Sequence, residues 1–282
     1  MREVLRIGEI RYSNCTPIYQ TLKGRFDCSR YEFVPGDPAE LNALLARGEI
    51  DVSSSSSIEY ARHWREYLVI PGVSVSSNGK VGSILLFSKR PIEGLGGEKV
   101  AVSKASATSV VLLKALFKAR CGIQANLVPR RPELSCMLDG CEAALLIGDE
   151  ALRERKAPGD ARGLHVYDLG QMWRELTGLP FVFALWMVRE DSAARLKGLV
   201  RGFARDLIAA KFLAARSYRK IAEEAPEVSW MGVHGLVSYW NLMSYDLGGE
   251  HLMGLKEFFG MAHGLGEAGE RPEIRFLPGV IY

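Results

Sequence analysis

An apolar segment that breaks at a glycine and continues as a helix constrains the fold of this chain more than any other feature. Residues 143–147 read Ala-Ala-Leu-Leu-Ile, and Gly148 and Asp149 precede a helical pattern that starts at Glu150. Apolar residues on both faces indicate a buried strand of a parallel sheet. Gly148 leaves room for a close approach, and Asp149 can accept the first free N–H groups of the helix. Such strand ends hold ligand sites in α/β proteins, although helix capping alone also explains Asp149.

Three other polar segments follow predicted strands in the same way. They are residues 12–16, 53–57 and 103–109, and each precedes a predicted helix. Lys104 is the one cationic side chain in the four segments, which otherwise offer hydroxyl, amide and backbone N–H groups. Such groups bind a carboxylate or a phosphate with help from the positive ends of helix dipoles. The alternative is that Ser57 and Thr108 only cap helices.

The order of the predicted elements indicates two α/β lobes. Strands and helices alternate, pause at a glycine-rich break, restart in the same pattern and give way to helices near residue 190. We therefore expect a first lobe of residues 1–88 and 190–282, and a second, inserted lobe of residues 89–189.

Three local expectations follow from the same patterns. We expect a short strand at residues 48–52, which would leave the serine run at residues 53–57 as the turn after it. An apolar strand at residues 181–188 is expected to pair with residues 81–88 where the chain crosses between the lobes. The aromatic residues of the helical tail, Tyr239 and Trp240 among them, are expected to belong to the core.

Composition and charge exclude several classes of protein. The net charge is +3 over 282 residues and the basic residues are scattered, which argues against nucleic-acid binding. Met1 is not followed by an apolar signal core, and no apolar run is long enough to cross a bilayer, so we expect a cytoplasmic protein without a membrane partner. Five dispersed cysteines without a CxxC pair suit a reducing compartment.

Common catalytic and cofactor motifs are also missing from the sequence. The five histidines do not have metal-ligand spacing, and there is no GxSxG, GxxxxGK[ST] or nicotinamide fingerprint. We therefore predict neither a metal nor a cofactor. The residues by themselves indicate a two-lobed α/β protein that binds a small polar anion between its lobes.

Several segments, in one order, resemble the chorismate dehydratase family of the futalosine route to menaquinone. The resemblance spans most of residues 6–190 and is carried by Asn14, Pro17 and residues 6–8, 56–61, 79–83, 106–109, 146–152, 168–170 and 177–184. Ser13 and Ser54 depart mildly from the family pattern, in which we expect more apolar residues. The resemblance implies the two-lobed fold of type II periplasmic binding proteins, with the ligand in a cleft between the lobes.

The resemblance also implies a reaction and a set of site residues. Chorismate, a dicarboxylate, would lose water to give 3-[(1-carboxyvinyl)oxy]benzoate, without a cofactor. Asn14 and Ser83 are predicted to act in catalysis by positioning the departing hydroxyl or the enolpyruvyl arm. The predicted substrate-binding residues are Ser56, Ser57, Thr108, Ser109, Gly148 and Asp149.

Two alternatives to this activity stay open at the level of sequence. A related family that makes 1,4-dihydroxy-6-naphthoate shares the fold and the pathway. A non-catalytic receptor of the same fold would bind a small anion, but a receptor is normally exported. The missing signal peptide therefore favours an enzyme over a receptor.

Overall fold

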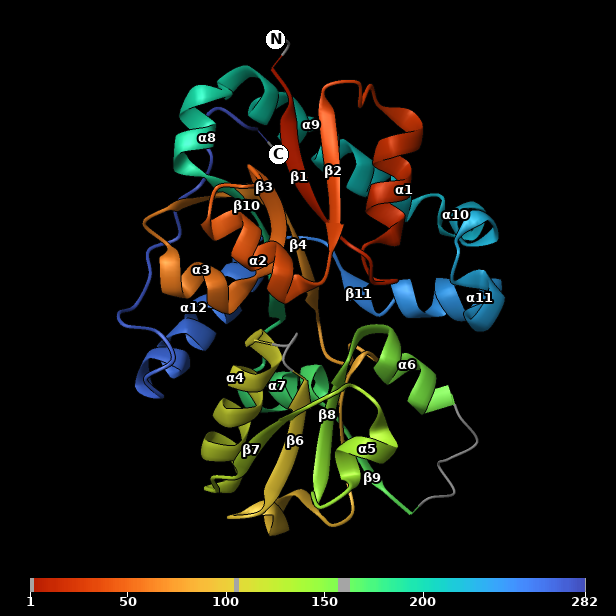
Figure 1. The fold of residues 1–282 in the computed structure, drawn as a ribbon, viewed down its shortest axis with the longest axis vertical. Coiled ribbons are helices and arrows are strands. Elements are labelled where there is room, and N and C mark those ends of the chain that lie inside the picture. Colours follow the sequence, from red (N-terminus) through yellow and green to blue (C-terminus); the bar gives the residue numbers. More distant parts are fainter. Residues whose placement is uncertain (1–2, 104–106, 157–162, 282) are drawn as a thin grey trace.

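The computed structural model describes residues 3–103, 107–156 and 163–281, and within them it has two β-sheets, one above the other in Figure 1. In spatial order the six-stranded sheet consists of β11 (Met243–Ser244), β4 (Tyr67–Ser77), β10 (Phe181–Arg189), β3 (Val52–Ser56), β1 (Leu5–Ile10) and β2 (Tyr31–Gly36). The five-stranded sheet consists of β7 (Asn126–Arg130), β6 (Lys99–Ser103), β8 (Ala143–Ile147), β5 (Ile84–Ser88) and β9 (His165–Asp168).

Helices cover both sheets, and each sheet with its helices is called a lobe below. The helices of the first lobe, which contains the six-stranded sheet, are α1 (Thr16–Arg25), α2 (Pro38–Ala46), α3 (Ser57–His63), α8 (Glu190–Arg195), α9 (Lys197–Ala215), α10 (Tyr218–Glu224), α11 (Val228–Trp240) and α12 (Gly249–Gly264). Those of the second lobe are η1 (Ile92–Leu95), α4 (Ala107–Leu116), η2 (Phe117–Cys121), α5 (Leu134–Leu138), α6 (Gly148–Lys156) and α7 (Leu169–Thr177).

The apolar segment at residues 143–147 forms the predicted strand. It is β8, which is parallel to β6 and antiparallel to β5, and its first four residues are buried. Strand β5 is buried along its whole length. Apolar side chains on both faces suit these strands because helices cover the sheet.

The serine run has a different structure from the one predicted. Residues 48–51 are not a strand, and four of the five serines lie in β3 itself, so that Ser57 begins α3. Strand β3 is parallel to β1 and antiparallel to β10, and the small side chains allow close packing between strands. A Cβ atom on Gly8 of β1 would lie 2.6 Å from Ser53 Oγ. Pairing in the sheet has overridden the local preference of serine for turns.

The predicted pairing between residues 181–188 and 81–88 is also wrong. Strand β10 pairs with β3 and β4 in the first sheet, whereas β5 pairs with β8 and β9 in the second. Strand β4 extends to Ser77, and it occupies the place beside β10. We therefore propose that the chain crosses between the lobes at residues 78–83 and 178–180 instead of at residues 88 and 189.

None of the helices in the described ranges is long and apolar enough to cross a membrane. The termini of the described chain lie in the first lobe, and the C-terminal helices pack on that lobe (Figure 1).

Candidate functional site

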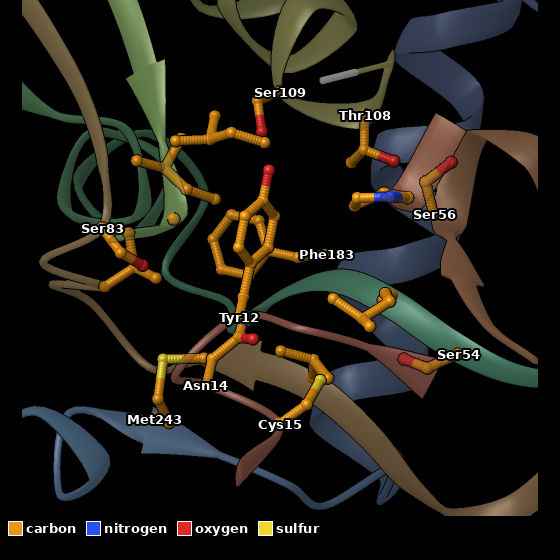
Figure 2. Close-up of a pocket in the computed structure, with 18 of the residues that line it drawn as sticks. Tyr12, Asn14, Cys15, Ser54, Ser56, Ser83, Thr108, Ser109, Phe183 and Met243 are labelled. Carbon is orange, nitrogen blue, oxygen red and sulfur yellow. The ribbon is translucent and has the colours of Figure 1, made fainter. Parts of the chain in front are cut away.

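A cavity between the two lobes is lined by residues from all four predicted polar segments (Figure 2). Its empty volume, part of which is open to solvent, is about 630 Å³. The polar and small residues that line it are Tyr12, Asn14, Cys15, Ser54, Ser56, Ser83, Thr108, Ser109 and Gly148. The apolar lining includes Ile10, Val75, Val81, Ile84, Ile147, Phe183 and Met243. Residues 104–106 of the predicted segment at 103–109 lie outside the described residues.

Five helices begin at this cavity. Cys15 and Ser56 are the N-cap residues of α1 and α3, and Pro38, Ala107 and Gly148 are the first residues of α2, α4 and α6. All five line the cavity, and none of the lining residues in the described chain is acidic, basic or a histidine. Helix starts present free N–H groups and a partial positive charge. The cavity can therefore bind an anion with neutral donors alone.

Asn14 lines the cavity and has an unused acceptor. Its side-chain oxygen is buried and has no hydrogen-bond partner within the described part of the chain. Its backbone oxygen accepts a hydrogen bond from the hydroxyl of Tyr245 at 2.6 Å, which holds the loop in place. A buried acceptor without a partner is costly, so a ligand that donates a hydrogen bond here gains affinity.

Ser83 lies on the segment that crosses between the lobes. Its hydroxyl accepts a hydrogen bond from the Tyr239 hydroxyl at 2.8 Å, and its backbone oxygen accepts one from Gly148 N at 2.7 Å. The carboxylate of Asp168 accepts from Val81 N and Gly82 N at 3.1 and 2.8 Å. The segment is thus held at three successive residues.

Thr108 connects the two lobes at one edge of the cavity. Its hydroxyl oxygen, on α4 of the second lobe, accepts a hydrogen bond from Ile58 N in the first turn of α3 at 3.1 Å. It also lies 3.4 Å from Ser57 Oγ, which is fully buried behind the cavity wall. Thr108 therefore satisfies a free N–H group of a helix in the other lobe.

Asp149 makes a second connection between the lobes, and it does not act as the predicted N-cap of its own helix. It is the second residue of α6, and its Oδ1 accepts hydrogen bonds from Ser13 N at 3.1 Å and Ser13 Oγ at 2.6 Å. The missing side chain of Gly148 makes room for the ring of Tyr12, because a Cβ atom there would lie 3.1 Å from that ring. Gly148 also has φ +62°, which favours glycine.

The titratable side chains at the cavity are held in their neutral forms. Burial raises the pKa of the Cys15 thiol to about 12. Burial, reinforced by Glu150, Asp37 and Asp149, raises the pKa of the Tyr12 phenol. Neither group is a base at neutral pH. Within the described residues no group of three or more histidine, cysteine, aspartate or glutamate side chains is placed to hold a metal ion.

Six of the eight predicted site residues line the cavity, and the other two lie directly behind it. The six are Asn14, Ser56, Ser83, Thr108, Ser109 and Gly148, whereas Ser57 and Asp149 contact the opposite lobe as described. Figure 2 shows Ser83 on one side of Tyr12 and Phe183, with Ser56 and Thr108 on the other. Phe183 and Met243 were not among the predicted site residues, because an apolar residue in a strand has the same sequence pattern whether it lines a cavity or fills a core.

Comparison with known proteins gives this cavity a chemical context. The family model described as menaquinone biosynthesis matches residues 5–264. A chorismate dehydratase of Thermus thermophilus is 33% identical over 267 residues, which cover 89% of this chain and 93% of the relative. A 1,4-dihydroxy-6-naphtoate synthase of the same organism is 27% identical over 98% of this chain and 100% of its own.

The fold itself matches that of periplasmic binding proteins. The periplasmic aliphatic sulphonate binding protein of Escherichia coli superposes with a TM-score of 0.68 at 17% identity, over 99% of both chains. The predicted two-lobed binding-protein fold is therefore confirmed.

Proposed function

The chain belongs to the menaquinone biosynthesis family, and from this premise we propose that it is a chorismate dehydratase, a carbon–oxygen lyase that acts in the cytoplasm. The identity to the Thermus thermophilus enzyme, 33% over most of both chains, supports this activity over the naphthoate synthase, which is less similar. The single observation on the structure that carries the proposal is the neutral, donor-rich cavity with an unpartnered Asn14 oxygen.

The donors and acceptors of the cavity complement those of chorismate. Chorismate carries two carboxylates, which the helix starts and the hydroxyls of Ser56, Thr108 and Ser109 can bind. It carries one hydroxyl group, and a hydroxyl is the donor that the free oxygen of Asn14 requires. Apolar residues such as Phe183 and Ile147 would face the ring.

The reaction removes a ring proton and the neighbouring hydroxyl. The C–H electron pair becomes the new ring π bond, the C–O bond breaks, and the hydroxyl leaves as water with the proton. Aromatic stabilisation of the product drives the step, so orientation of the substrate is the main task of the protein.

The proton acceptor is proposed to be a carboxylate of the substrate itself. The described lining residues contain no carboxylate or histidine, and the Cys15 and Tyr12 side chains are protonated at neutral pH. The enolpyruvyl carboxylate is tethered next to the carbon that loses its proton, which makes proton transfer within the substrate geometrically simple. Asn14 and Ser83 would hold the hydroxyl that departs.

The test is to incubate the purified protein with chorismate and to follow the mass of the small molecule. We expect a product lighter by one water and an ultraviolet spectrum of a substituted benzoate. Chorismate that binds and is recovered unchanged would indicate a binding protein of the same fold. Chorismate that neither binds nor reacts would contradict the proposal and favour the naphthoate synthase activity.

A further inference from the structure

A buried tyrosine from the C-terminal part of the chain contacts the hydroxyl proposed to act in catalysis. Tyr239 lies near the end of α11, is 3% exposed, and donates its hydroxyl proton to Ser83 Oγ at 2.8 Å. Ser83 lines the cavity, whereas Tyr239 lies behind it and does not. Tyr239 can therefore influence a bound substrate only through Ser83.

The backbone of Ser83 is held by groups other than Tyr239, which contacts only the Ser83 side chain. Gly148 N bonds to the Ser83 carbonyl oxygen, and Asp168 holds the N–H groups of the two preceding residues. Those contacts fix the position of the Ser83 backbone, and therefore of its Cα atom. They leave its Cα–Cβ and C–O torsions free.

We infer that Tyr239 is a positioning residue that turns Ser83 into a hydrogen-bond donor toward the substrate. A serine hydroxyl has one proton to donate and two lone pairs to accept with. The bond from Tyr239 occupies a lone pair on the side away from the cavity, so the Ser83 proton is left to point into the cavity. A donor there can bind the departing hydroxyl and stabilise the charge that develops as its C–O bond breaks.

The phenol keeps this role at neutral pH. Burial raises the pKa of Tyr239, and the nearby carboxylates of Asp149 and Asp168 also raise it. The phenol therefore stays protonated and keeps donating to Ser83, and the orientation of Ser83 does not titrate.

The inference rests on the proposed dehydratase activity, and a double-mutant cycle on chorismate turnover tests it. Wild type, Tyr239→Phe, Ser83→Ala and the double variant are compared by kcat and KM. We expect kcat to fall about 100-fold for Ser83→Ala and about 10-fold for Tyr239→Phe, with KM nearly unchanged. In the Ser83→Ala background, Tyr239→Phe should change kcat by less than about twofold, because the group it acts through is gone.

A matched control separates positioning from structural support. Tyr31→Phe also removes a phenol that donates to a side-chain oxygen, that of Asp206 at 2.8 Å, but on the outer strand β2. It should keep the wild-type kcat. Phenylalanine preserves the buried ring at residue 239, and circular dichroism and thermal melting verify that both variants are folded.

Each outcome of the cycle is decisive. An equal fall in kcat for Tyr239→Phe in both backgrounds, or an unchanged kcat in the wild-type background, overturns the role of Tyr239 while the dehydratase activity stands. A wild-type protein that does not dehydrate chorismate overturns the proposed function, and the inference about Tyr239 with it.

Discussion

The two lobes hold their sides of the cavity in different ways. The first-lobe loop that carries Asn14 is held within its own lobe: Tyr245 donates to Asn14 O at 2.6 Å and Trp240 Nε1 donates to Ser13 O at 2.8 Å. In the second lobe, Thr108 and Asp149 make their hydrogen bonds to residues of the first lobe. The loop of the first wall therefore has hydrogen bonds within its own lobe as well as to Asp149, whereas Thr108 and Asp149 make theirs to the opposite lobe.

The cores of the two lobes differ in the size of the side chains that they pack. The first lobe has a dense aromatic cluster in which the rings of Phe181 and Phe258 are 4.9 Å apart, and Trp173 of α7 packs against both from the second lobe. One face of the second sheet instead packs a small cluster that includes Ala101, Ala144 and Met137. Loss of a first-lobe residue should therefore affect stability or kcat, whereas loss of a contact between the lobes should affect mainly KM.

The largest expected effect is on stability, from Phe258→Ala. It should lower the free energy of unfolding by about 3–5 kcal/mol, because a large fully buried ring leaves a cavity that the surrounding aromatic residues cannot fill. Met137→Ala in the second lobe should cost about 2 kcal/mol, because the five-residue helix α5 can move to fill the space. Urea unfolding of both variants measures the difference. Equal losses would contradict the contrast between the cores.

The next effect is on turnover, from Asn14→Ala. Removal of the unpartnered amide oxygen of Asn14 from the first wall should lower kcat on chorismate about 100- to 1,000-fold, as for other preorganised polar groups. Asn126→Ala is the control, since this exposed asparagine lies at the start of β7 in the second lobe. Full activity in Asn14→Ala would show that the first wall does not position the reacting group.

A smaller effect should appear in KM, from Ser13→Ala. This change removes the 2.6 Å hydrogen bond to Asp149 and leaves the cavity lining intact. A hydrogen bond to a carboxylate is worth about 1.5 kcal/mol or more, so KM for chorismate should rise about tenfold while kcat changes by less than about twofold. Ser229→Ala, at an exposed serine of α11, is the matched control. A fall in kcat without a rise in KM would contradict the expected effect of this contact between the lobes.

The smallest effect concerns the dependence of stability on pH. Burial at the start of α6, with Asp149 nearby, raises the pKa of Glu150 above its ordinary value of 4.5. A carboxyl group with a higher pKa in the folded chain contributes stability at low pH, and that contribution is lost as the pH rises through the folded pKa. Glu150→Gln should therefore gain stability relative to wild type between pH 4 and pH 7. Urea unfolding at both pH values measures the free energy of unfolding of the two proteins. A variant that loses stability relative to wild type between pH 4 and pH 7 would contradict this prediction.

Local patterns were sufficient for β8 and for the polar segments that meet at the cavity. The apolar segment before Gly148 became β8, and residues from each of the four polar segments line the same cavity. The serine run was misassigned as a turn because its backbone pairs with β1 and β10, which are distant in sequence. Pairing of β10 with β4 was missed for the same reason, since strand order depends on contacts that a local pattern does not contain.

The sequence by itself therefore determined the α/β class, the family and the neutral, hydroxyl-rich chemistry of the site, because these depend on residue type and local order. Only the tertiary structure decided what each polar group contacts. Asp149 looked like a helix cap and instead accepts from Ser13 in the other lobe, and Tyr239 looked like core and also donates to Ser83. Hydrogen bonds act over about 3 Å, so their partners are chosen by the packing that brings distant segments together.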